Sequence, residues 1–236
     1  MMGEVFKKYK ENFSKFIIYF ILAIIIHVIT SSITTDVMLK LQLGYNVDIT
    51  DILNFKMIII ILINIYLSAY LLLITKKIIK GEIIEQKDIF PEALHYFPRL
   101  LGVALMYGAI TFFVFYIGII AMYVNSALFI LFVILFLLWM IFAIFLSPTS
   151  QYLVYNDEKI GGSIKSGFKL GKKYFFKILG LIGILALILI IKDSLTKTEY
   201  DIAIVITYSI VFQLFHAYFC LYISNMCKEE EEAEIS

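Results

Sequence analysis

Six uninterrupted apolar segments constrain this chain more than any other feature of its sequence. They are residues 16–33, 57–74, 100–124, 127–146, 175–191 and 202–223. A helix needs about 20 apolar residues to cross the hydrocarbon core of a bilayer, and its backbone groups must be hydrogen-bonded within the protein. Because the segments are apolar on all sides, we expect six transmembrane helices. The sequence therefore predicts an all-α fold, a polytopic membrane helix bundle.

The composition leaves no room for a separate soluble domain. Of the 236 residues, 61% are hydrophobic and 17% are charged, whereas a soluble domain carries about 25% charged residues. Residues 1–226 are predicted to form a single membrane domain, and the glutamate-rich residues 227–236 a disordered acidic tail in the cytoplasm. A signal peptide is the alternative interpretation of the first apolar segment. Its similarity to later internal segments favours a retained span.

Basic residues are distributed unequally between the two sides of the predicted bundle. Sixteen of the 20 lie before the first segment, in the connections at 76–99 and 156–177, or in the tail. The other side has four, namely Lys40, Lys56, Lys192 and Lys197. Cytoplasmic loops carry the excess of lysine and arginine. We therefore expect a multi-pass protein of the cell membrane with both termini in the cytoplasm.

Three similar sequences lead into the odd-numbered segments. They are Asn-Phe-Ser-Lys-Phe at 12–16, Tyr-Phe-Pro-Arg-Leu-Leu-Gly at 96–102 and Tyr-Phe-Phe-Lys-Ile-Leu-Gly at 174–180. Each is preceded by an amphipathic stretch, and basic amphipathic helices lie in the headgroup plane. The sequence thus predicts three repeated hairpins, each preceded by an interfacial amphipathic helix. The repeats are approximately residues 1–75, 82–155 and 156–226.

Prolines and small residues give more local expectations. Pro98 and Pro148 fall near the inner membrane boundary, where they should bend or end helices. Small residues let helices approach closely, and we expect packing contacts at two groups of them. These are Ala104 with Gly108, and Gly180 with Gly183 and Ala186.

The region after the fourth segment resembles a known membrane domain. The residues that carry the resemblance are Tyr155-Asn156-Asp157-Glu158-Lys159-Ile160 and Ser163-Ile164-Lys165-Ser166-Gly167-Phe168-Lys169-Leu170-Gly171-Lys172, after a segment that holds Trp139 and Pro148. They resemble the multi-pass membrane domain fused to some glycerophosphoryl diester phosphodiesterases, and related stand-alone membrane proteins of bacteria and archaea. The resemblance implies a multi-pass membrane fold. The phosphodiesterase is a separate soluble barrel that this sequence lacks, so its activity is not implied.

Polar residues inside the apolar segments are candidates for a functional site. In the last segment Ser209, Gln213, His216, Cys220 and Ser224 form one helical stripe. In the second, Asn64, Ser68 and Thr75 share a face. The candidate intramembrane site comprises His27, Asn64, Ser68, Gln213 and His216. Two interpretations stay open: a polar path in which His216 relays protons, or hydrogen bonds that hold helices together.

A second candidate site lies beside the spans. Basic residues next to a membrane attract anionic headgroups, and the candidates here are Lys165, Lys169, Lys172, Lys173 and Arg99. Because headgroups explain these basic residues, the sequence predicts no nucleic acid partner. The sequence predicts no cofactor and no metal, because His216 and Cys220 are two ligands on one helix and supply no convergent set.

Three functions are compatible with these features. A non-catalytic module that binds a membrane lipid or a membrane-protein partner explains the basic amphipathic helices and the lack of a catalytic motif. A transporter or channel for a small solute would use the polar stripes, although no carboxylate lies deep within a span. A membrane enzyme acting on lipids is the third. The sequence favours the first, and predicts that the protein is not an enzyme.

Overall fold

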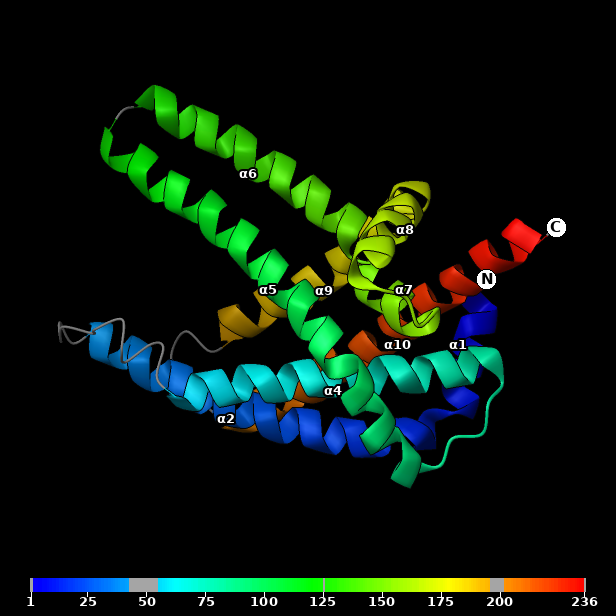
Figure 1. Ribbon diagram of the computed structural model, residues 1–236. Coiled ribbons are helices and arrows are strands. Elements are labelled where there is room, and N and C mark those ends of the chain that lie inside the picture. The colour runs from blue at the N-terminus through cyan, green and yellow to red at the C-terminus, as the bar shows by residue number, and fades with distance from the viewer. Residues whose placement is uncertain (1, 43–54, 125, 196–201, 236) are drawn as a thin grey trace.

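The computed structural model describes residues 2–42, 55–124, 126–195 and 202–235, and every regular element in these ranges is helical (Figure 1). The elements are α1 (Met2–Glu11), the 3-10 helix η1 (Phe13–Phe16), α2 (Ile17–Gln42), α4 (Phe55–Lys80), α5 (Gln86–Val124), α6 (Ser126–Leu146), α7 (Thr149–Tyr155), α8 (Ile160–Lys173), α9 (Phe175–Leu195) and α10 (Ile202–Ile235). The predicted all-α fold is confirmed. Lys197, one of the four basic residues expected on the outer side, lies outside the described residues.

Five of the described helices are long and apolar enough to cross a membrane. These spans are Phe13–Ile33, Phe55–Lys80, Gln86–Ala121, Leu128–Tyr155 and Ile202–Ala233. A sixth arises if α8 and α9 count as one broken span, because they pass the same test together across a bend of 90°. The lengths agree with a polytopic membrane bundle. The first and last described residues lie at one end of the molecule, opposite the α5–α6 turn (Figure 1).

The buried core lies toward the end of the bundle that holds both termini. There α2, α4 and α10 pack against one another, and buried side chains are concentrated in the second halves of α4 and α10. The α5–α6 hairpin leaves this core at an angle (Figure 1). In the most apolar stretch of each span, 44% of the residues are buried for Phe55–Lys80 but 6% for Leu128–Tyr155. The hairpin therefore presents its apolar side chains outward, where lipid tails are as apolar a surrounding as the core.

The three predicted hairpins are only partly visible as units. Helices α2 and α4, α5 and α6, and α9 and α10 each pack as pairs, and α1 and α8 precede the first and third pairs. The second pair differs, because α5 runs without a break from Gln86 through Pro98. The stretch predicted as an interfacial helix before this pair is thus continuous with α5, and Pro98 does not end the helix. The threefold repeat stays a prediction.

Contacts with α4 hold the first turns of α5 in place. Lys77 Nζ on α4 pairs with a carboxylate oxygen of Glu92 on α5 at 2.7 Å. The Tyr66 hydroxyl on α4 donates to the carbonyl oxygen of Phe90 on α5 at 2.9 Å. These bonds hold the start of α5 alongside α4, so the helix stays continuous despite its prolines. By contrast, Pro148 does end a helix as predicted, since α6 stops just before it and α7 begins just after it.

The acidic tail is helical, and the prediction of disorder is wrong. Helix α10 continues to Ile235, and the Glu230 side chain is only 8% exposed. A carboxylate oxygen of Glu230 lies 3.0 Å from Lys169 Nζ, and its other oxygen contacts Lys173 Nζ. Pairing with α8 thus offsets the repulsion among like charges that predicts an unfolded tail.

Two glycines of α8 allow the closest approach between helices. A Cβ atom on Gly171 would lie 2.0 Å from the carbonyl oxygen of Phe145, and one on Gly167 would lie 2.7 Å from Cα of Thr149. Backbone therefore touches backbone where α8 crosses the α6–α7 break. Among the glycines for which we expected packing contacts, Gly108, Gly180 and Gly183 have no atom of another element within 4 Å of such a Cβ.

We expect Gly171→Ala to destabilise the protein by about 1–3 kcal/mol, because the added methyl group meets a backbone carbonyl that has no rotamer to change. Gly161→Ala is the matched control in the same helix, where a Cβ has open space. It should be neutral or stabilising by up to about 1 kcal/mol, since alanine favours a helix over glycine. Unfolding in mixed micelles followed by circular dichroism measures both. Equal effects of the two substitutions would contradict the close contact.

Candidate functional site

A cluster of polar side chains joins α2, α7 and α10 inside the bundle. We call it the Tyr19 cluster; its members are Tyr19, Gln151, Gln213, His216 and Cys220. The Tyr19 hydroxyl donates to Oε1 of Gln213 at 2.7 Å and lies 3.1 Å from Nδ1 of His216. Nε2 of His216 lies 3.6 Å from Sγ of Cys220, and Nε2 of Gln151 donates to the same sulfur at 4.0 Å. Three of these contacts thus link α2 and α7 to α10, and the fourth, between His216 and Cys220, lies within α10.

The directions of these contacts follow from the number of protons available. Tyr19 has one hydroxyl proton, which goes to Gln213, so Nδ1 of His216 must carry a hydrogen and donate it to Tyr19. In the neutral imidazole Nε2 is then an acceptor, and it receives the thiol proton of Cys220. Every bond of the cluster therefore runs the same way, from Gln151 to Gln213. The geometry assigns His216 to a single tautomer and satisfies both of its ring nitrogens.

The structure brings together only part of the predicted intramembrane site. Gln213 and His216 belong to the Tyr19 cluster. Asn64 and Ser68 are exposed, and their side chains donate to the carbonyl oxygens of Ile60 and Asn64 in their own helix. Such bonds to the preceding turn satisfy a polar group without any neighbouring helix. These two residues therefore do not join the cluster.

His27 lies apart from the cluster, beside Tyr208. The centroids of these two rings are 5.5 Å apart. Tyr208 and Phe212 have stacked rings, as do Phe212 and His216, so a row of rings along α10 separates the two histidines. His27 is thus within an aromatic row and is not in direct contact with His216.

The predicted polar stripe of the last segment does face the interior. Ser209, Gln213, Cys220 and Ser224 are all buried. Ser224 Oγ lies 3.0 Å from Oγ1 of Thr75 on α4. The stripe of α10 and the polar face of α4 therefore meet near the end of the bundle that holds the termini, where a hydroxyl pair links the two central helices.

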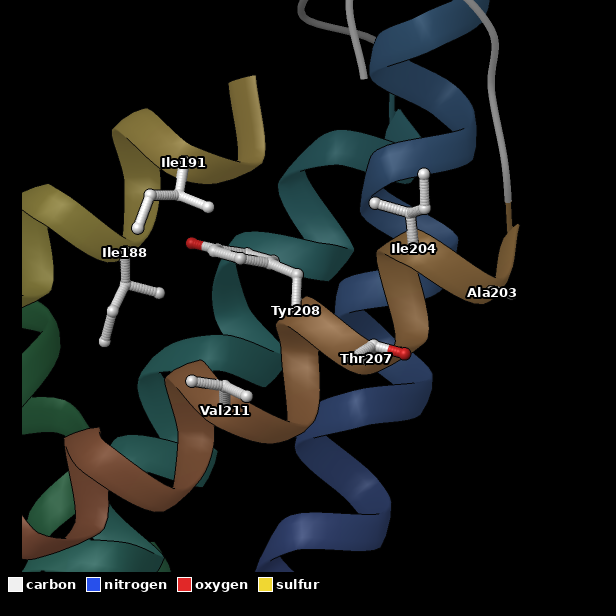
Figure 2. A pocket seen from close by; sticks show the side chains of 7 residues that line it. All are labelled: Ile188, Ile191, Ala203, Ile204, Thr207, Tyr208 and Val211. Carbon is white, nitrogen blue, oxygen red and sulfur yellow. The ribbon is translucent and has the colours of Figure 1, made fainter. Parts of the chain in front are cut away.

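An apolar pocket of about 370 Å³ lies between α9 and α10 (Figure 2). Ile188 and Ile191 line it from α9, and the remaining lining residues on α10 are Ala203, Ile204, Thr207, Tyr208 and Val211. Figure 2 shows the Tyr208 ring projecting from α10 toward Ile188 and Ile191. The volume is within the usual range for small-molecule sites, about 300–1,000 Å³. The sequence does not indicate this pocket, because its lining residues are the same types as those on any lipid-facing part of a span.

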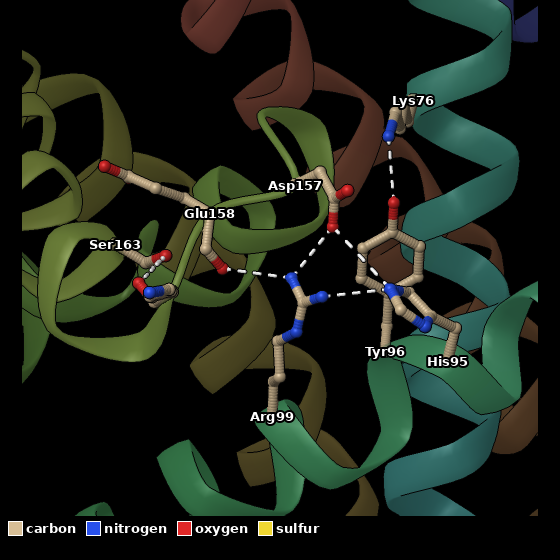
Figure 3. A network of polar contacts seen from close by, with 8 residues as sticks. Lys76, His95, Tyr96, Arg99, Asp157, Glu158 and Ser163 are labelled. Atoms are coloured by element: carbon tan, nitrogen blue, oxygen red, sulfur yellow. Dashed lines mark hydrogen bonds and ion pairs between the residues drawn. The ribbon is translucent and has the colours of Figure 1, made fainter.

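Arg99, a candidate headgroup ligand, is bonded to protein groups (Figure 3). Its Nη1 lies 2.8 Å from a carboxylate oxygen of Asp157 and 3.3 Å from the carbonyl oxygen of Glu158, and its Nη2 lies 2.9 Å from Nε2 of His95. Asp157 has a left-handed backbone with φ of 51°, which costs a residue other than glycine some energy. Arg99 therefore ties α5 to the strained turn between α7 and α8.

The lysines of α8 divide into two pairs. Lys169 and Lys173 contact Glu230 of α10, whereas Lys165 and Lys172 are exposed and have no ion pair among the described residues. Beside them the Tyr174 hydroxyl donates to Oε2 of Glu229 at 3.2 Å. Burial, together with the charge of Glu229, raises the pKa of Tyr174 to about 12, so the hydroxyl keeps the proton that it donates.

Sequence reasoning missed two residues that organise these sites. Tyr19 is one of three aromatic residues in the first segment, and the available signal is that a buried tyrosine hydroxyl needs a partner. Glu230 is one of a run of glutamates, and no local pattern distinguishes it from its neighbours. Both are found only through contacts between distant parts of the chain.

Comparison with protein-family models, with curated proteins and with solved structures found no match for this chain. The resemblance of residues 155–172 to the phosphodiesterase-linked membrane domain stays a prediction.

Replacing Tyr19 by phenylalanine removes the central hydroxyl of the Tyr19 cluster and leaves Gln213 Oε1 and the Nδ1 hydrogen of His216 without partners. We expect the free energy of unfolding to fall by about 1–2 kcal/mol. Tyr116→Phe is the control, since that tyrosine is 52% exposed and should change stability by less than about 0.5 kcal/mol. Equilibrium unfolding in mixed micelles compares them. A loss of the same size in both variants would show that the cluster does not bind the helices together.

Proposed function

We propose that this protein is a non-catalytic, multi-pass membrane protein that binds a membrane lipid in the pocket between α9 and α10. The pocket itself carries the proposal. Its lining consists of isoleucine, valine and alanine side chains with one tyrosine and one threonine, and it has no charged residue. An acyl chain matches such a surface, because its methylene groups make van der Waals contacts with the lining side chains. A polar solute would find no charged partner there.

The Tyr19 cluster supports this choice over a transporter or channel. A path for a polar solute needs polar groups that face open space, whereas Gln213 and His216 bond to Tyr19 and Cys220. Asn64 and Ser68 bond to their own helix. These groups are already satisfied by protein, which favours their role as links between and within helices.

The proposal places α9 across the membrane as the sixth span, with α8 in the headgroup plane. Two observations support it. Both termini lie at one end of the molecule (Figure 1), as an even number of crossings requires, and α8 meets α9 at 90°. The excess of basic residues at 76–99 and 156–177 assigns that end to the cytoplasm.

Cysteine labelling tests this topology. With Lys56→Cys, we expect a membrane-impermeant maleimide to react in intact cells; with Lys172→Cys, it should react only after permeabilisation. Lys56 and Lys172 are both exposed, and the two native cysteines, Cys220 and Cys227, are buried, so the unmodified protein is the background control. The opposite pattern, or labelling of both positions from outside, would contradict six crossings with cytoplasmic termini.

Filling the pocket tests lipid binding. Ala203→Phe places a ring in the pocket, and the amount of lipid that co-purifies in mild detergent should fall, because the ring occupies the space and the van der Waals contacts of the acyl chain. Ile206→Phe is the control, because Ile206 is 38% exposed on the same helix and does not line the pocket. Native mass spectrometry counts the lipids bound to each protein.

Two results would contradict the proposed function. One is equal lipid retention by the unmodified protein and both variants. The other is a purified protein with no bound lipid but a stoichiometric membrane-protein partner, which would assign the surface to protein contacts instead.

A further inference from the structure

The four lysines of α8 form a basic face turned away from the bundle. Lys165, Lys169, Lys172 and Lys173 follow helical spacing and lie on one side of the helix. The opposite side holds Gly167 and Gly171, the two residues in closest contact with the α6–α7 break. The contact that fixes α8 on the bundle therefore also fixes the direction in which its lysines point.

The angle between α8 and α9 sets the level of the basic face. Because the two helices meet at 90°, α8 lies parallel to the membrane plane when α9 crosses along the membrane normal. This placement rests on the proposed topology of α9 and is independent of the pocket. The basic face then lies at the depth of the phosphate groups, where lysines gain from anionic lipids.

The end of α10 occupies half of this face. Glu230 contacts Lys169 and Lys173, whose side chains nevertheless remain 64% and 47% exposed. Glu229 holds the same turn of α10 in place, because it accepts hydrogen bonds from Tyr174 at 3.2 Å and from Asn225 at 3.3 Å. Lys165 and Lys172 are left open to the surroundings. One helical face thus presents two lysines bound to a carboxylate and two available for another anion.

We propose that the acidic end of α10 competes with anionic phospholipid headgroups for the basic face of α8. A headgroup phosphate engages Lys165 and Lys172 first, and then displaces Glu230 from Lys169 and Lys173. In a zwitterionic bilayer the end of α10 stays on α8; in an anionic bilayer it is released. The position of the end of α10 therefore depends on the charge of the adjacent leaflet.

The strengths of the contacts are suited to such an exchange. Glu230 is buried, but Lys169 and Lys173 are partly exposed, so salt and headgroups reach these ion pairs from the lysine side. Each lysine near an anionic surface strengthens binding by about fivefold, so the headgroups replace the carboxylate without needing a specific pocket. Once headgroups bind the two lysines, Glu230 is a buried carboxylate without a counter-charge. This favours its movement into water, together with the end of α10.

Titration of the purified full-length protein with short-chain phosphatidylglycerol tests the competition, with native mass spectrometry as the readout. Glu230→Gln should strengthen phosphatidylglycerol binding by about fivefold. Binding of phosphatidylcholine with the same chains should not change. Glu232→Gln is the matched control, because it removes one charge from the same tail where Glu232 pairs within α10 with Lys228 at 3.4 Å. Lys165→Gln combined with Lys172→Gln should weaken phosphatidylglycerol binding.

Comparing phosphatidylglycerol with phosphatidylcholine distinguishes headgroup binding at α8 from lipid binding in the pocket. Loss of both lipids in Ala203→Phe concerns the pocket, whereas a change confined to phosphatidylglycerol concerns α8. Equal gains in Glu230→Gln and Glu232→Gln would overturn the competition, because the overall charge of the tail would then explain them. Unchanged binding in Glu230→Gln would overturn it as well.

Hydrogen exchange provides a second test that does not depend on substitution of the glutamate. In the unmodified protein, amides of residues 226–235 should exchange faster in phosphatidylglycerol nanodiscs than in phosphatidylcholine nanodiscs. In Lys169→Gln combined with Lys173→Gln, exchange should be fast in both. Identical exchange of the unmodified protein in the two lipids would show that headgroups do not release the end of α10.

Discussion

Inside a bilayer an apolar helix gains little by leaving lipid for protein, so close packing and polar bonds must hold the helices together. In this protein those bonds converge on α10. It contacts α2 and α7 through the Tyr19 cluster and α4 through the pair of Ser224 with Thr75. Further along, Glu230 joins it to α8. The burial of the second halves of α4 and α10 follows from this arrangement, and the outer ends of the spans are left more exposed.

At the end of the bundle that holds the termini, ion pairs and close backbone packing together hold α8 in place. Arg99 ties the start of α8 to α5 through Asp157, and Glu230 contacts the last turns of α8. Gly167 and Gly171 press the middle of the same helix against the α6–α7 break. Three kinds of contact therefore fix one amphipathic helix. This explains how α8 stays at a right angle to α9 although its own sequence has few apolar residues.

The sequence predicts those features that depend on neighbouring residues along the chain. The apolar segments and the break at Pro148 are of this kind, and so is the interior orientation of the α10 stripe. The continuity of α5 through Pro98 is not, because it depends on Lys77 and Tyr66 of another helix. The helical tail depends on lysines far from Glu230 in sequence. Tyr19, which bonds to Gln213 and His216, is also distant from them in the sequence.

The single direction of the bonds in the Tyr19 cluster has an electrical consequence. To carry a proton along the cluster, every hydroxyl, thiol and imidazole would have to exchange its donor role for an acceptor role. The cluster ends in the side-chain amides of Gln151 and Gln213, and an amide neither takes up nor gives away a proton at ordinary pH. The row of polar groups is thus closed at both ends. It strengthens the centre of the bundle while leaving the membrane as good a barrier to protons as an apolar core would.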